Sequence, residues 1–234
     1  MANTTYQELY QRVLLRLGNL ASDGRALLAA KEAVNTAHKA IARVQDFDEL
    51  LVLDTTNAAT VASTKTYHLE DDWGLTRPKD LLTVRYMDGN NSRKLTRLTA
   101  RELDEKIPYV EGLGEQKPRW YIRRGNSVEL IPVPDEAKDV YVYYSQWPKV
   151  LTEDSDTTSY SDLDDVIIAL GTEIALAVLE GTHADWDARA RAYLASAVKD
   201  NRSRPDRTWV ARPFEVAPGV TGEPWKDPFV KSYP

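Results

Sequence analysis

Apolar residues recur at helical spacing in two segments near the start of the chain. In residues 6–17 and 24–45 they return at steps of three and four positions, and Gly18 follows the first segment. This spacing places apolar side chains on one face of an α-helix, and glycine commonly follows a helix end. Alanines in the narrow seam of the second segment let another helix approach closely. The pattern therefore predicts an antiparallel hairpin of two helices.

Helical spacing returns after the acidic stretch that begins near residue 152. Residues 162–180 form a strongly apolar segment, and Thr182 opens a further segment that extends to about residue 202. Acidic residues at the start of the first segment and basic residues near the end of the second suit the helix macrodipole. We expect a second helical hairpin in this part of the chain.

The region between the helical segments favours short strands. Alternating runs rich in β-branched and aromatic residues are separated by turn residues, a pattern that is typical of strands. A short helix interrupts the series, because Thr99 and Glu102 have the spacing of a capping box. The candidate strands are residues 50–54, 66–70, 81–87, 93–98, 119–124, 127–132 and 139–147.

Residues 203–234 differ in composition from the rest of the chain. They hold six of its twelve prolines, a density that excludes helix and central strand. Disordered tails are usually poor in aromatic residues, whereas this segment is rich in them. We interpret it as an extended arm that lies along another surface. Its candidate binding residues are Trp209, Phe214, Trp225, Phe229 and Tyr233.

Together these patterns predict an α+β fold. Two helical hairpins, residues 1–48 and 151–202, are expected to form one four-helix bundle. A β-rich meander, residues 49–150, is expected as an insertion in that bundle, and the extended C-terminal arm follows it.

Composition excludes several classes of protein. The formal net charge of −6 argues against a free-standing duplex-binding protein, which usually has a basic footprint. The chain has no cysteine, so disulfide scaffolds and thiolate metal sites are excluded. Residues 1–13 lack the apolar core of a signal peptide, and no run approaches the roughly 18 apolar residues of a membrane span. We expect a protein that is made and used in the cytoplasm, or in a particle assembled there.

Candidate catalytic and metal sites are weak. Residues 154–165 resemble a calcium loop, but Ser159 stands where the sharp turn requires glycine, and Asp165 replaces the bidentate glutamate. The histidines, His38, His68 and His183, lie far apart and accompany no recognisable nucleophile pattern. The sequence therefore predicts no cofactor, no metal and no enzymatic activity.

Residues 119–135 combine arginines with aromatic residues, which raises the question of nucleic-acid binding. Gly125 and Asn126 separate two alternating runs, a signal for a two-residue hairpin turn. Strand alternation puts Trp120 on the face opposite Arg119 and Arg123. A platform that stacks bases needs aromatic and basic side chains on the same face. The pattern therefore favours a β-hairpin.

With the segments laid out, the chain resembles the adaptor proteins of tailed bacteriophages, also called head-to-tail connector or head-completion proteins. The resemblance covers roughly residues 4–200. It rests on a hairpin ending in "PVPD" (132–135), a strand ending in "YYSQWP" (143–148), an acidic linker and the apolar helix "DDVIIALGTEIAL". The N-terminal helical hairpin also fits.

The resemblance implies a structural virion protein in the neck between head and tail. Such adaptors form a ring, typically a dodecamer, that docks below the portal protein and extends the DNA channel. The ring offers a platform to tail or neck proteins, and genomic DNA passes without sequence-specific binding. No membrane is involved. In several relatives a C-terminal segment contacts portal subunits, so we expect the arm to bind the portal or a neighbouring subunit. Arg119 and Arg123 are candidate contacts to an acidic neighbour.

Two alternatives remain open at this point. The first is a β-rich ligand- or receptor-binding tail module, in which aromatic residues of the β block line a groove. Core packing and strand propensity account for the same residues and are favoured. The second is a small hydrolase. The aromatic residues concerned are Trp120, Tyr121, Tyr141, Tyr143, Tyr144 and Trp147.

Overall fold

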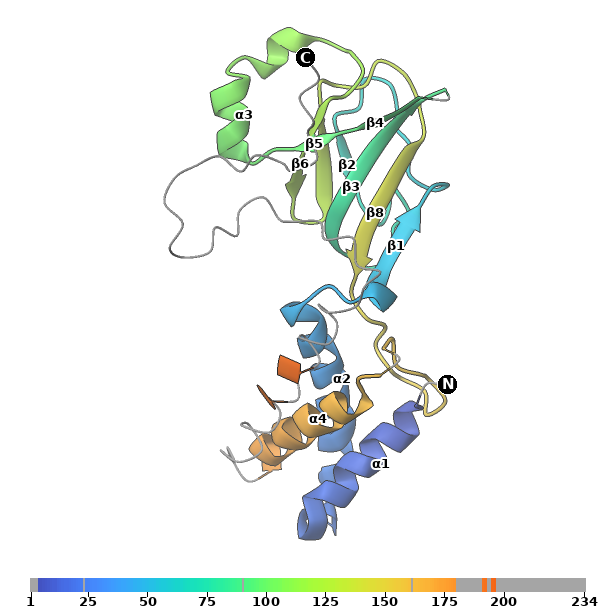
Figure 1. Cartoon of the computed structure of the whole chain (residues 1–234), viewed down its shortest axis with the longest axis vertical. Coiled ribbons are helices and arrows are strands. Elements are labelled where there is room, and N and C mark those ends of the chain that lie inside the picture. Colours follow the sequence, from blue (N-terminus) through green and yellow to red (C-terminus); the bar gives the residue numbers. More distant parts are fainter. Residues whose placement is uncertain are drawn as a thin grey trace, which may run out of the picture.

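The chain is divided into a helical lobe and a β lobe that meet at a narrow waist (Figure 1). The computed structural model describes residues 4–179 except 23, 90 and 161, together with residues 191, 192, 195 and 196. The chain enters the β lobe after α2 and returns to the helical lobe after β8 (Figure 1). Within the described residues, the two lobes are therefore joined by two crossings of the chain.

Three helices make up the described part of the helical lobe. The first begins with a capping box, in which the Thr5 side chain accepts a hydrogen bond from the Glu8 backbone and the Glu8 carboxylate accepts one from the Thr5 backbone. This arrangement satisfies two donors that a helix start leaves without partners. The helices are α1 (Tyr6–Leu17), α2 (Ala26–Val44) and α4 (Asp164–Leu179).

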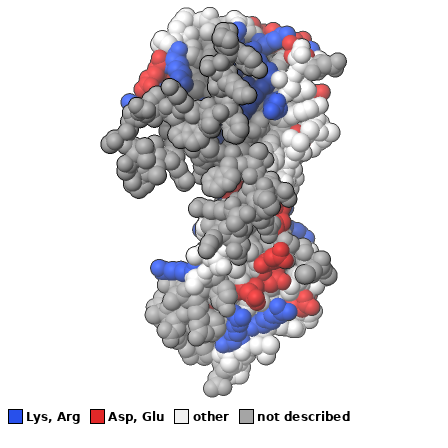
Figure 2. Space-filling view, in the orientation of Figure 1, with Lys and Arg blue, Asp and Glu red and all other residues white. Residues whose placement is uncertain are grey.

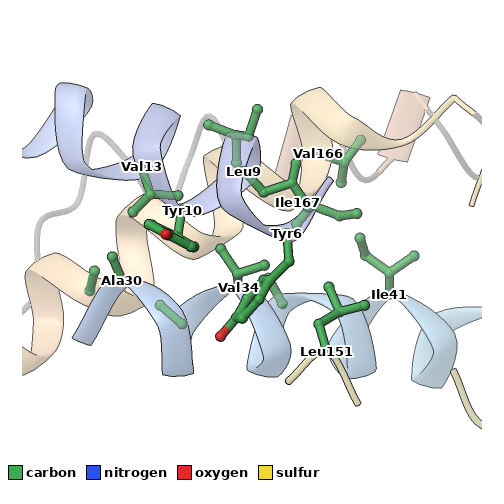
Figure 3. Packing of buried hydrophobic residues seen from close by; sticks show 14 of the residues in the cluster. Tyr6, Leu9, Tyr10, Val13, Ala30, Val34, Ile41, Leu151, Val166 and Ile167 are labelled. Carbon is green, nitrogen blue, oxygen red and sulfur yellow. The ribbon is translucent and has the colours of Figure 1, made fainter. Parts of the chain in front are cut away.

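These helices bury a single apolar core. Figure 3 shows Leu9 of α1, Val34 of α2 and Ile167 of α4 directed into the same space, and all three side chains are fully buried. Gly171 lets α4 come close to its neighbours. A methyl group built there would lie 3.3 Å from Val13 Cγ2 and 3.7 Å from the Val34 backbone nitrogen.

The β lobe contains two four-stranded sheets. In the first, the strand order is β1-β8-β3-β4, and all pairs are antiparallel. In the second, the order is β2-β7-β6-β5, and only β5 and β6 are parallel. The strands are β1 (Leu51–Asp54), β2 (Thr66–His68), β3 (Pro78–Asp88), β4 (Asn91–Lys94), β5 (Thr96–Arg97), β6 (Trp120–Arg124), β7 (Ser127–Ile131) and β8 (Val140–Gln146).

The two sheets share one core, and the second sheet is covered on its other face as well. Val84 of β3, Val142 of β8 and Val128 of β7 belong to one buried cluster between the sheets. On the outer face, Ile122 and the short helix α3 (Ala100–Lys106) form a further cluster. Because both faces of the β6–β7 hairpin are covered, its side chains are buried on alternate sides.

Several elements expected from the sequence are confirmed. The hairpin of residues 119–132 is present, with Gly125 in the left-handed region at φ 61°. The Thr99–Glu102 capping box opens α3 as predicted. The helices expected at 6–17, 24–45 and 162–180 form with ends within about two residues of the prediction.

The expected four-helix bundle with a meander insertion is wrong, although the α+β class is right. In the described residues, α1, α2 and α4 pack together, whereas α3 lies on the β lobe. The β block is two packed sheets, in which β8 pairs with both β1 and β3, strands distant from it in sequence. Periodicity identifies the buried face of an element but not its partner. The helix expected at 182–202 and the arm lie largely outside the described residues.

Candidate functional site

The two arginines expected at a subunit interface lie at different depths. Arg123 donates to the Asp80 carboxylate at 3.0 Å and to the Lys79 carbonyl oxygen at 2.6 Å. Arg97 also pairs with Asp80, at 3.1 Å, so Asp80 links a strand of the first sheet to the second. Arg119 is exposed, and no carboxylate of the described residues forms an ion pair with it. The inter-subunit role of Arg119 and Arg123 stays a prediction.

The remaining sequence-based binding residues, those of the arm, lie outside the described residues, as does His183. The role of the arm as a portal- or neighbour-binding segment therefore stays a prediction. Its candidate residues are Trp209, Phe214, Trp225, Phe229 and Tyr233.

Aromatic rings of the β block fill the core. Tyr121 and Tyr144 are each 2% exposed, within the cluster between the sheets. Burial raises the pKa of the Tyr121 hydroxyl to about 12, because the phenolate would be poorly solvated there. Tyr121 and Tyr144 are therefore not available to a ligand, and core packing accounts for these two rings. The other four aromatic residues named for a groove, Trp120, Tyr141, Tyr143 and Trp147, are half-buried.

The acidic loop that resembles a calcium site is organised by the chain itself. Asp156 accepts hydrogen bonds from the backbone nitrogens of Thr152 at 2.8 Å and Glu153 at 3.0 Å, and pairs with Lys149. The Lys149 ammonium and these backbone donors hold the pKa of Asp156 well below its usual range. Among the described residues, no group of three or more potential ligands is arranged to hold a metal ion.

His38 is a structural residue of the helical lobe. It is 1% exposed, and its Nε2 accepts a hydrogen bond from the Ser159 backbone nitrogen at 3.2 Å. The Tyr160 hydroxyl donates to the His38 carbonyl oxygen at 3.2 Å. Burial lowers the pKa of His38 to about 4; the backbone of Lys149 opposes that shift, and the positive charge of Arg77 adds to it. A neutral imidazole therefore joins α2 to the loop before α4.

The lobe junction is held by a lysine and a tryptophan. Lys79 of β3 donates to the Asp46 carboxylate at 2.7 Å and to the carbonyl oxygen of Ala42 in α2. The Trp147 ring lies 5.7 Å from the Lys79 ammonium and 5.6 Å from that of Lys39, within the range of cation–π attraction. A cleft opens beside these contacts, lined by α2, Arg77 and residues 147–150.

An apolar surface lies at the other end of the helical lobe, where α1 ends and α2 begins. Leu15 is 80% exposed, Leu28 62% and Leu27 49%. A shallow groove that includes Leu15 is also lined by Leu14 and Ala21, among others. Clustered apolar side chains on a surface often mark protein–protein contacts. We call Leu15, Leu27 and Leu28 the apolar tip.

Charged side chains are separated into patches. Figure 2 shows acidic residues gathered on the helical lobe below the waist with basic residues next to them, and both basic and acidic residues on the β lobe. Such separation gives the molecule surfaces of opposite sign that two copies, or two different proteins, can bring together.

Sequence reasoning missed the residues of the lobe junction. Lys39 and Arg43 are four positions apart on one helix, a spacing that puts both on the same face of α2. That signal was available in the sequence. No local pattern relates Arg77 to this face, because the contact between the lobes depends on how the chain crosses the waist.

Comparison with known proteins adds one finding. A family model described as SU10 adaptor protein matches residues 4–216, which is nearly the whole chain. A search of curated proteins gives no match. Among the described helices, none combines the length and the apolar character needed to cross a membrane.

Proposed function

The chain belongs to the SU10 adaptor protein family, and from this premise we propose that it is a head-to-tail connector of a tailed bacteriophage. Membership in the family supports a structural role in the virion. We propose further that the chain forms a ring below the portal protein and that it has no catalytic activity. The match over residues 4–216 is the observation that carries the proposal.

A ring in the neck requires each subunit to present two different surfaces that fit one another. The charge patches supply surfaces of opposite sign, and the apolar tip supplies exposed apolar surface whose burial against another subunit is favourable. These features support a ring, for which the resemblance suggests twelve copies. The ring extends the DNA channel and offers a docking platform for tail or neck proteins.

The net charge of −6 supports a passive relation to DNA. Repulsion between phosphates and an acidic lumen keeps DNA from adhering as it passes. The proposed ring therefore conducts genomic DNA without sequence-specific binding. It is assembled in the host cytoplasm and remains in the neck of the virion.

The arm, residues 203–234, is the segment that we assign to the portal or to a neighbouring subunit. A segment of this length spans several tens of ångströms when extended. Its aromatic residues can bury large apolar areas on a partner, as aromatic anchors do at many interfaces. We also assign the exposed Arg119 to an acidic neighbour.

Co-sedimentation with purified portal rings tests this function. The full chain is expected to sediment with the portal and to form a ring visible by electron microscopy. A chain that ends at residue 202 is expected to lose most of that binding. The matched control keeps all 234 residues but replaces the arm aromatics with serine; it should lose binding to a similar degree. Undiminished binding by both variants contradicts the role of the arm, and a full chain that never joins the portal contradicts the function.

A further inference from the structure

A cleft at the lobe junction has a volume of about 550 Å³. One wall is a face of α2, another includes Arg77, which immediately precedes β3, and residues 147–150 after β8 complete the lining. Part of the lining is apolar, including Ala40 and the half-buried ring of Trp147. The volume lies within the range of pockets that bind small molecules or a few side chains of a peptide.

Positively charged side chains dominate the polar part of this lining. Lys39 and Arg43 reach it from the same face of α2, and Arg77 reaches it from the β lobe. No carboxylate of the described residues forms an ion pair with any of these three. The cleft therefore contains three cations that the described fold does not neutralise.

The other charged residues of the lining are already engaged. Lys149 pairs with Asp156 of the acidic loop. Glu70 is the one acidic residue of the described lining, and its carboxylate accepts a hydrogen bond from the Asn126 amide at 3.2 Å. Its single negative charge offsets only part of the charge of Lys39, Arg43 and Arg77, so the lining stays positive.

Like charges that gather in a concave, partly apolar space raise the local potential and attract an anion. Trp147 adds a flat apolar surface beside the Lys39 ammonium. Guanidinium groups bind carboxylates in bidentate fashion, with stronger hydrogen bonds than neutral pairs make. A ligand that carries carboxylates on short apolar stems matches both parts of the lining.

We propose that this cleft binds an acidic segment of a partner protein, whose carboxylates bridge Lys39 and Arg43 of the helical lobe to Arg77 of the β lobe. A nucleic-acid strand fits less well, because its phosphates follow one another along a continuous backbone and require a basic track. The cleft offers three cations in one hollow. Occupation of the cleft ties the two lobes together at the waist.

This inference rests on the proposed function in one respect only, which is that the partner carrying the acidic segment is another protein of the virion. Binding is measured with the purified full chain alone. The probe is a fluorescein-labelled peptide, Glu-Asp-Leu-Glu-Asp, followed by fluorescence anisotropy. We expect saturable binding that weakens as salt is added, because the contacts are ionic.

Single substitutions locate the binding. Arg43→Gln and Arg77→Gln are each expected to weaken the affinity for the peptide by about tenfold, because each variant loses a hydrogen bond to a charged group. Arg93→Gln is the matched control, since Arg93 is an exposed residue of β4 outside the cleft and loses the same charge; binding should stay unchanged. Arg43 is exposed on a helix, so its variant tests the cleft even if substitution at Arg77 disturbs the fold.

Three results would overturn the proposal. One is equal binding by the wild type and both cleft variants. Another is equal binding of a Gln-Asn-Leu-Gln-Asn peptide, which lacks the charges. The third is tighter binding of a labelled five-nucleotide single strand than of the acidic peptide. Because this assay contains no portal, a negative result here leaves the ring to be judged by co-sedimentation.

Discussion

The β lobe and the helical lobe bury their apolar residues in different ways. In the β lobe, large rings fill the space between two sheets, and Tyr67, Trp73, Tyr86 and Tyr144 are each at most 2% exposed. In the helical lobe, alanines such as Ala30 let the helices pack closely, and a few aromatic rings such as Tyr160 and Phe47 lie among them.

The consequences appear at the surface. The helical lobe leaves the leucines of the apolar tip exposed at one end. A loop also holds the start of α1: the backbone nitrogen of Tyr6 donates to the carbonyl oxygen of Asp156 at 2.7 Å, and that of Gln7 to the carbonyl oxygen of Asp154 at 3.1 Å. The β lobe also exposes large apolar side chains, Leu53, Val61 and Tyr109, but these belong to three separate segments. The helical lobe exposes leucines where α1 ends and α2 begins, and we infer that this end contacts another molecule. This difference can be tested by perturbing each lobe in turn.

The largest expected effect is the loss of the Trp73 ring. Trp73 is fully buried and stacks on Tyr67 with ring centroids 5.7 Å apart. Trp73→Ala is expected to destabilise the β lobe by about 4 kcal/mol, because it removes a large buried side chain and leaves a cavity. Urea denaturation followed by near-UV circular dichroism measures this loss.

Far-UV circular dichroism of the same variant shows whether the lobes unfold together. If the β lobe is self-contained, the helical signal should persist after the near-UV signal is lost. Simultaneous loss of both signals would show that the two lobes form one cooperative unit.

Acid is expected to weaken the helical lobe through His38. Its pKa is lowered in the folded chain from an ordinary 6.5 to about 4. Between these pH values the unfolded chain binds a proton that the folded chain does not. The free energy of unfolding is therefore unaffected by His38 above about pH 6.5. It falls as the pH drops, by roughly 3 kcal/mol at pH 4. Urea denaturation at a series of pH values measures the decline.

A variant separates this effect from the titration of carboxylates. His38→Gln cannot take up the proton, so its stability should vary less between pH 6.5 and 4 than that of the wild type. The other groups that act on His38 are the positive charge of Arg77, the backbone of Lys149 and the ring of Tyr160, which packs edge-on against the imidazole. Parallel pH curves for the wild type and the variant would show that His38 is not responsible.

Local patterns in the sequence predicted the elements well. Thr99 and Glu102 lie three positions apart, so their capping box could be recognised from sequence alone. Gly125 and Asn126 likewise marked a turn between adjacent strands. The partners of each element could not be recognised in this way. Pairing of β1 with β8 joins residues about ninety positions apart, and alternation within a strand does not say which strand lies beside it.

The candidate sites follow the same division. Arg123 was chosen for its position in a hairpin, yet its guanidinium is held by Asp80 of another sheet. The lobe-junction cleft was missed because Arg77 meets the face of α2 only through the tertiary fold. Binding residues on one helix can be recognised by spacing, whereas a site shared by two lobes requires the structure.

A third prediction concerns the close approach of α4. Gly171→Leu is expected to destabilise the helical lobe by about 2 kcal/mol, because a larger side chain must displace Val13 and the backbone of α2. Gly171→Ala is the control: its methyl group needs only a small shift, and alanine favours the helix by up to about 1 kcal/mol. Thermal denaturation compares the two. Equal stability of the Leu and Ala variants would mean that α4 is not tightly packed.

The smallest effect on stability is expected at the apolar tip. Leu15→Ser changes a side chain that is 80% exposed, so the free energy of unfolding should shift by no more than about 0.5 kcal/mol. If the tip is kept apolar for another protein, the same change should reduce assembly with portal rings. Val61→Ser, at a 58% exposed position of the β lobe outside both the tip and the lobe-junction cleft, is the matched control and should leave assembly intact. Loss of stability without loss of assembly would place the tip in the fold of the subunit and reverse the contrast between the two lobes.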